Sequence, residues 1–146
     1  SGQFGLFRDA DAKIKWPTFH VFDLYGRYFN GQRLPSETVS PSFAWNWKTK
    51  TGSEGQPREV PYVETMASYD KGQVVIMAIN KHPEEPVHLN IKLKGYDKPV
   101  TTAFLETLTA KHKDDTDAIL NKERLEIKQP LVIKLPQHSF SAITLR

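Results

Sequence analysis

The stretch QVVIMAIN, residues 73–80, contains six apolar residues in succession between a Gln and an Asn. Alternate side chains of a β-strand point to opposite faces, so an unbroken apolar run predicts a strand that is buried on both faces. Before it, Asp70-Lys71-Gly72 places a Gly where a tight turn needs a left-handed residue, and a β-type run over residues 60–69 precedes that turn. These segments predict a hairpin whose second strand lies at the centre of a packed core.

Further strands are predicted on the C-terminal side of this hairpin. Residues 87–94 alternate strictly between apolar and polar side chains, which indicates one buried face and one wet face. Residues 101–108, 131–135 and 139–145 are also β-type, and Pro136-Gln137-His138 is expected to form the hairpin between the last two. We therefore expect a mainly β fold, an antiparallel β-sandwich of jelly-roll type.

One helix is predicted ahead of the strands, over residues 18–29. Pro17 suits a first helical turn, and Asn30-Gly31 suits a C-terminal end. The helix is apolar over more than half of its circumference, through Val21, Leu24, Tyr25 and Tyr28 at helical spacing and through Phe19, Phe22 and Phe29 beside them. Such a helix either packs between two bodies, one of them missing here, or closes the sandwich's own core.

The remaining composition excludes several classes of function. The chain of 146 residues carries a net charge of +3, with basic residues spread along it rather than gathered in the patch that nucleic acid requires. No apolar run approaches the roughly 18 residues of a membrane-spanning helix. There is no Cys, which removes disulfides and thiolate metal sites but leaves the compartment open between a bacterial cytoplasm and secretion.

Two polar stretches are predicted to be loops, and the first residues look unlike a natural start. Residues 48–58 hold no apolar side chain, and residues 111–124 are charged and polar apart from Ala118-Ile119-Leu120, so the second loop has room for one helical turn at most. The N-terminus lacks a Met, a basic segment and an apolar segment, so we expect a fragment or an excised piece and no signal peptide.

Four motifs, in this order and spacing, resemble the C-terminal part of glycoside hydrolase family 51, the α-L-arabinofuranosidases. They are WPTFHVFDLY at residues 16–25, VPYVETMASYDKG at 60–72, VVIMAINKHPEEPV at 74–87 and LPQHSFSAI at 135–143. The resemblance implies that residues 1–34 end a (β/α)8 catalytic barrel, whose last helix is the one predicted above, and that residues 35–146 form the C-terminal sandwich. The segment DAILNKERL at residues 117–125 and the polar loop at 48–58 depart from the family's pattern, which leaves a neighbouring barrel family such as the β-xylosidases as an alternative.

The resemblance further implies an accessory role. The parent enzyme would remove terminal α-L-arabinofuranosyl residues from arabinan or arabinoxylan. This domain's partner would be the barrel of the same polypeptide. Enzymes of the family are often oligomeric, so a homo-oligomeric parent is also implied. Retaining glycosidases need two carboxylates about 5–5.5 Å apart, and in this family both lie on barrel strands. Here Glu84-Glu85 are neighbours in a Pro-bounded turn and Asp114-Asp115 lie in a charged loop, so we expect no catalytic residue and no activity in this chain.

The histidines also argue against a site of their own. No two of them have metal-ligand spacing on one strand or helix, so neither a metal nor another cofactor is expected. His82 and His138 are instead expected to hydrogen-bond turns, with Asn80 as a turn former at a strand end. The five histidines are His20, His82, His88, His112 and His138.

Trp45 and Trp47 are the remaining candidates for a binding role. They are two residues apart and so share one face of a predicted strand near Phe43. They form either a structural stripe, in the core or against the barrel, or a platform on which the sugar rings of a plant cell-wall polysaccharide stack. The second alternative would make the chain a carbohydrate-binding module, and a third class of function is an interaction module that drives oligomerisation.

Overall fold

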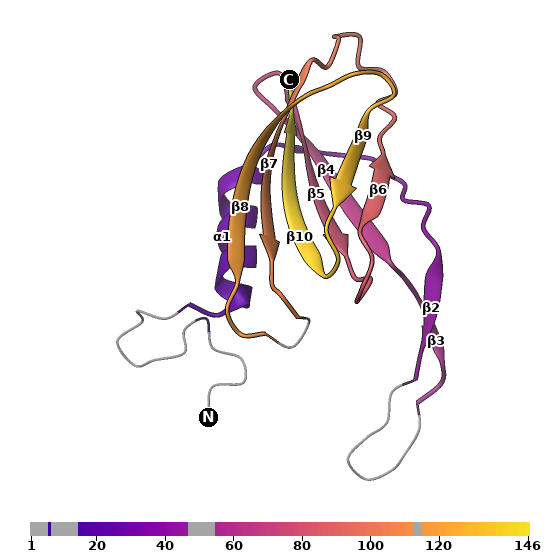
Figure 1. Cartoon of the computed structure of the whole chain (residues 1–146). Helices are drawn as coiled ribbons and strands as arrows, with labels where there is room; N and C mark the ends of the chain where they lie inside the picture. Colours follow the sequence, from indigo (N-terminus) through magenta and orange to yellow (C-terminus); the bar gives the residue numbers. More distant parts are fainter. Residues whose placement is uncertain (1–5, 7–14, 47–54, 113–114) are drawn as a thin grey trace.

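The computed structural model describes residue 6 and residues 15–46, 55–112 and 115–146. Within these ranges it contains one helix and ten strands (Figure 1). Their bounds are α1 (Pro17–Tyr28), β1 (Gln32–Leu34), β2 (Ser42–Trp45), β3 (Arg58–Pro61), β4 (Val63–Asp70), β5 (Gln73–Asn80), β6 (Val87–Asn90), β7 (Thr102–Thr109), β8 (Ile119–Glu126), β9 (Val132–Leu135) and β10 (Ser139–Leu145).

The main sheet has six strands in the order β1-β4-β5-β10-β7-β8, and all its neighbouring pairs are antiparallel. The apolar run of β5 lies near its middle, as predicted. Val74 and Ile76 belong to the core on one face, whereas Val75 and Met77 belong to the core on the other. The turn before β5 is also confirmed, because Lys71 and Gly72 both have positive φ, at 47° and 84°, as a two-residue hairpin loop of type I′ requires.

A second layer, the pair β6–β9, covers one face of this sheet. Ile133 and Leu135 of β9 are fully buried against Ile143 and Leu145 of β10. The sandwich is therefore confirmed, but the hairpin predicted at residues 136–138 is wrong. β9 pairs with β6 while β10 pairs with β5 and β7, so the chain crosses between sheets there. β10 is buried at every position and belongs in the middle of the large sheet, whereas β9 is buried only at alternate positions.

A third layer, α1, covers the other face of the large sheet. It begins after Trp16 with Pro17 in the first turn, and Asn30 Nδ2 donates a 2.7 Å hydrogen bond to the oxygen of Gly26 near the helix end. Leu24 is fully buried against a second core cluster that includes Met77, Leu108 and Phe140. The helix therefore closes a core of the domain with its inner face.

Several segments differ from the sequence prediction. The strand predicted over residues 87–94 ends at Asn90. Residues 119–124, predicted as part of a loop, belong to the edge strand β8, which pairs with β7 along its whole length. The predicted strand at 60–69 is divided at Tyr62, so that β3 pairs with β2 in a separate ribbon and β4 with β5. Residues 32–34 add a short edge strand beside β4. The loop predicted at residues 48–58 lies mostly outside the described residues, and its last residue, Arg58, begins β3.

Candidate functional site

The helix α1 has two different faces, and the inner one packs on the main sheet. Leu24 lies at its centre, and Tyr25 packs its ring on Phe140 with centroids 5.2 Å apart. The Tyr25 hydroxyl donates to the sulfur of Met66 at 3.6 Å. These contacts use the half of the apolar stripe that the helical spacing places on one side.

The outer face of α1 has no comparable partner in the described part of the chain. Phe22 is 62% exposed, the largest exposed fraction of any aromatic residue described. Gly26, one helical turn later and therefore beside it on the surface, is also exposed, and a Cβ added there would meet nothing within 4 Å. A Gly inside a helix costs about 0.5–1 kcal/mol relative to Ala. The ring of Phe22 projects into solvent, and Gly26 beside it has no side chain, so another body could approach the helix closely at this point.

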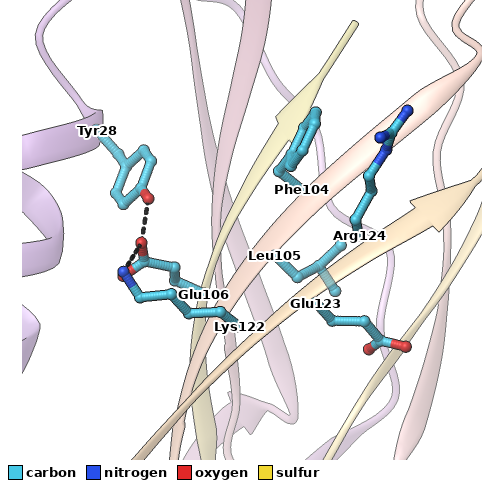
Figure 2. Close-up of a pocket in the computed structure, with 7 residues that line it drawn as sticks. All are labelled: Tyr28, Phe104, Leu105, Glu106, Lys122, Glu123 and Arg124. Carbon is cyan, nitrogen blue, oxygen red and sulfur yellow. Dashed lines mark hydrogen bonds and ion pairs between the residues drawn. The ribbon is translucent and has the colours of Figure 1, made fainter.

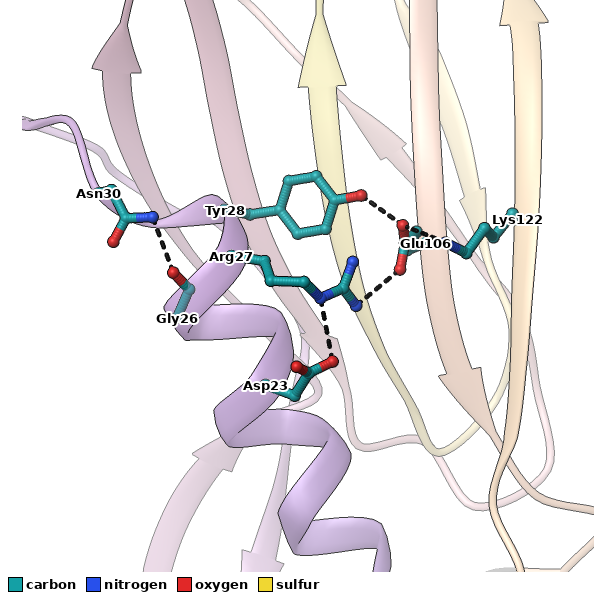
Figure 3. A network of polar contacts seen from close by, with 7 residues as sticks. All are labelled: Asp23, Gly26, Arg27, Tyr28, Asn30, Glu106 and Lys122. Carbon is teal, nitrogen blue, oxygen red and sulfur yellow. Dashed lines mark hydrogen bonds and ion pairs between the residues drawn. The ribbon is translucent and has the colours of Figure 1, made fainter.

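A polar network fixes the edge of α1 to the sheet, and Figure 3 shows its members. Glu106 on β7 is the acceptor, with its side chain only 9% exposed. Arg27 Nη2 donates to one carboxylate oxygen at 2.8 Å, and Lys122 Nζ on β8 lies 2.9 Å from the other. The Tyr28 hydroxyl donates to that second oxygen as well. Arg27 also pairs with Asp23 one turn earlier, at 3.0 Å.

The network changes the protonation equilibria of its members. Burial by itself would raise the pKa of Glu106, but the hydrogen bonds from Arg27, Tyr28 and Lys122 outweigh it and lower that pKa to about 2. Burial and the bond to Glu106 raise the pKa of Tyr28. The bond to Glu106, opposed by burial, raises the pKa of Arg27. Glu106 is therefore a structural carboxylate, because its proton is bound far too weakly for acid–base chemistry near neutral pH.

A depression of about 260 Å³ opens between this network and β8 (Figure 2). Its carboxylates are Glu106 and Glu123, and they cannot act as a glycosidase pair. Glu106 pairs in register with Lys122, so Glu123 is one position along β8 and points to the other face of the sheet. The remaining lining residues are Tyr28, Phe104, Leu105, Lys122 and Arg124.

Three of the four acidic residues considered in the sequence are described, and they lie in turns. The backbone N–H groups of Glu84 and Glu85 both donate to His82 Nδ1, at 3.3 and 2.8 Å, so the two residues belong to one tight loop. Asp115 accepts a 3.0 Å hydrogen bond from the backbone of His112, while Asp114 lies outside the described residues.

The predicted turn roles of Asn80, His82 and His138 are confirmed. The Asn80 amide, 1% exposed, donates to the oxygens of Glu85, Leu135 and Pro136 at 3.2, 3.3 and 2.8 Å. Its own oxygen accepts from the backbone of His82 at 3.0 Å. The two ring nitrogens of His138 lie 3.1 and 3.0 Å from the oxygens of Pro83 and Ala110. Together these side chains tie three loops to the same end of the sandwich.

Of the two tryptophans considered for a carbohydrate platform, the structure describes only Trp45. Trp45 ends β2 and is 47% exposed, on a ribbon that stands clear of the sandwich in Figure 1. Trp47 lies outside the described residues. The structure thus places Trp45 away from both cores.

The described residues contain neither a metal-binding cluster nor a membrane-spanning helix. No group of three or more His, Asp or Glu side chains in them is arranged to hold a metal ion. The helix that they contain is not long and apolar enough to cross a membrane.

The sequence comparison decides the family. A sequence profile of the "Alpha-L-arabinofuranosidase C-terminal domain" matches residues 6–144. The chain belongs to this family. No curated protein matches the chain closely enough to count as a relative.

Solved structures show the same fold in larger enzymes. The domain resembles the GH51 arabinofuranosidase from Xanthomonas axonopodis pv. citri (22% identity, TM-score 0.68, covering 91% of this chain). It also resembles the GH51 enzyme from Thermotoga petrophila RKU-1 (14%, 0.66, 81%) and AbfB, a family 51 α-L-arabinofuranosidase from Bifidobacterium longum (18%, 0.63, 93%). The arabinofuranosidase domain spans 27% of each of those three chains, so it corresponds to one domain of a larger polypeptide.

Sequence reasoning missed the Glu106 network altogether. Glu106 lies two residues from Phe104 and from Leu108, so strand alternation places it on an apolar face, and that was the available signal. Its partners Arg27 and Tyr28 are 79 and 78 residues away in the chain, and nothing local identifies them.

Proposed function

We propose that this domain stabilises the catalytic barrel of an α-L-arabinofuranosidase by docking on it through the outer face of α1. The observation that carries the proposal is the exposed ring of Phe22 beside the open surface at Gly26, on a helix whose other face is fully packed. The helix would then lie between two bodies, as its wide apolar stripe predicts. In the Xanthomonas enzyme a domain of this fold makes up 27% of the chain, so the rest of a polypeptide of that kind would supply the second body.

The proposal includes a domain boundary. Residues 1–34 would close the barrel, with α1 as its last helix, and residues 35–146 would form the sandwich. Because β1 already pairs with β4, the chain reaches the main sheet at residue 32, just before that boundary. The helix α1 would be shared, with its inner face on the sheet and its outer face on the barrel.

The activity belongs, in this proposal, to the barrel. The intact enzyme would remove terminal α-L-arabinofuranosyl residues from arabinan or arabinoxylan by a retaining mechanism, and this domain would contribute no catalytic group. Glu106 and Glu123 point to opposite faces of the sheet, and Glu106 is already bound by three donors. We expect the isolated chain to leave an aryl α-L-arabinofuranoside intact under conditions in which the full polypeptide hydrolyses it.

The docking is tested by Phe22→Ser in two forms of the protein. In the isolated chain the ring is exposed, so the unfolding midpoint should change by no more than 1–2 °C. In the full polypeptide the ring would be buried, and its loss should lower the midpoint of the barrel's unfolding by several degrees. Val39→Ser is the matched control, because Val39 is 90% exposed and belongs to the connection between β1 and β2 rather than to α1. An equal effect of Phe22→Ser in both forms would refute docking through this face.

A further inference from the structure

We propose that Trp45 and Arg58 form a carbohydrate-binding subsite on the β2–β3 ribbon, which stacks one sugar ring of the polysaccharide. The class of ligand rests on the proposed function, whereas the site rests on the geometry of the ribbon. Trp45 and Arg58 are directly opposed across the two strands, so their side chains share one face.

The ribbon is amphipathic, and its apolar face is the one that carries Trp45. Strand alternation puts Phe43 on the same face, and its cross-strand partner is Val60. The opposite face is polar: Ser42 Oγ donates a 2.5 Å hydrogen bond to Glu59 there. An isolated two-stranded ribbon is only marginally stable in water, so an apolar face that projects from the domain indicates a ligand or a partner.

A stack of rings holds the base of the ribbon in place. Phe43 packs on Tyr62 with ring centroids 5.0 Å apart, and Tyr62 packs on His82 at 4.6 Å. His82 is in turn fixed by its hydrogen bonds to the turn that follows β5. Trp45 lies two positions from Phe43 on the same face of β2, so it continues this row of aromatic side chains outward from the sandwich.

The chemistry of the exposed surface suits a sugar ring. The exposed 47% of Trp45 amounts to on the order of 100 Å², because a Trp side chain offers at most about 250 Å². One aromatic face matches the apolar face of a single sugar ring, and the guanidinium of Arg58 supplies up to five N–H donors for hydroxyl and ring oxygens.

The test is native affinity electrophoresis of the chain in gels that contain arabinoxylan or arabinan, with a gel without polysaccharide as reference. The wild type should be retarded in at least one of them, and Trp45→Ala should weaken that retardation at least fivefold. Trp45→Phe should keep part of it, because a flat ring remains, and Arg58→Gln should reduce it. Phe22→Ala, which removes a still more exposed aromatic ring on α1, should migrate like the wild type.

Three results would overturn the proposal. The first is a wild type that is retarded by neither polysaccharide, and the second is a Trp45→Ala variant that is retarded as strongly as the wild type. The third is a dimer in sedimentation that dissociates on Trp45→Ala, which would make the ribbon a contact between copies of the chain. None of these results bears on docking through α1, which the Phe22→Ser comparison tests separately, so the two proposals fail independently.

Discussion

At the scale of single residues, Glu106 makes the folded state sensitive to acid. Its pKa of about 2 in the fold lies below its ordinary value of 4.5, so the folded state favours the charged carboxylate. The resulting stabilisation is fully present above about pH 4.5 and is lost as the pH falls toward 2. Because the side chains of Arg27 and Lys122 are 37% and 67% exposed, solvent screens part of it, and we expect on the order of 2 kcal/mol.

Glu106→Gln should therefore lower the free energy of unfolding by about that amount at pH 7. The difference between variant and wild type should shrink to less than half by pH 3, because the carboxyl group is then almost fully protonated in the unfolded chain and folding has to release that proton. Urea denaturation at both pH values measures it. Glu84→Gln, an exposed acid in a turn, is the control and should show neither effect. A difference that stays constant from pH 7 to pH 3 would contradict the electrostatic account.

Asn80 is a second residue whose side chain stabilises several segments of the chain at once. It satisfies three backbone oxygens and one backbone N–H at the end of the sandwich. Asn80→Ala would leave these buried groups unpaired, and we expect a loss of about 2–3 kcal/mol in urea denaturation. Asn90→Ala, at an exposed position of β6, should cost less than about 0.5 kcal/mol. Similar losses for the two variants would mean that the Asn80 amide is readily replaced by water.

At the scale of elements, the sequence predicts a strand best where the residues of that strand alone determine how deeply it is buried. The bounds of β5 and β10 agree with the prediction because each is an apolar run that is closed by turn residues. The edge strand β8 was missed, because it has a neighbour on one side only and carries charged residues such as Lys122 and Arg124. Its strand character comes from pairing with β7, which no local pattern encodes.

Substitutions at Gly26 separate the stability of α1 in the isolated domain from its proposed docking on the barrel. Gly26→Ala should raise the free energy of unfolding of the isolated chain by about 0.5–1 kcal/mol, since Ala favours a helix and the new Cβ meets nothing within 4 Å. Gly26→Leu should be tolerated there as well. In the full polypeptide Gly26→Leu should instead lower the unfolding midpoint, because a bulky side chain would hold the barrel away. Equal tolerance of Gly26→Leu in both forms would show that nothing approaches α1 closely at this point.

At the scale of the whole molecule, three layers are stacked, and the sequence predicted them unequally. The sandwich followed from alternation in β6 and from continuous burial in β5, and the apolar stripe of α1 correctly indicated a helix that packs on a core. The crossing between β9 and β10 was not predicted, because a three-residue connection is also the usual length of a hairpin loop. Which strands become neighbours depends on the cores they share, and those join residues far apart in the chain.

Removal of α1 tests whether the third layer belongs to this domain. A chain that begins at Gln32 would expose one whole face of the main sheet, with Met77, Leu108 and Phe140 in it. We expect it to bind a hydrophobic dye and to unfold well below the complete chain, or to aggregate, since each of these side chains loses about 1.5–3 kcal/mol of burial. Leu24→Ala, which keeps the helix but removes its central contact, should cost 2–5 kcal/mol in urea denaturation. If the truncated chain instead unfolded at the midpoint of the complete one without binding dye, α1 would serve the barrel alone and the domain would be a two-layer sandwich.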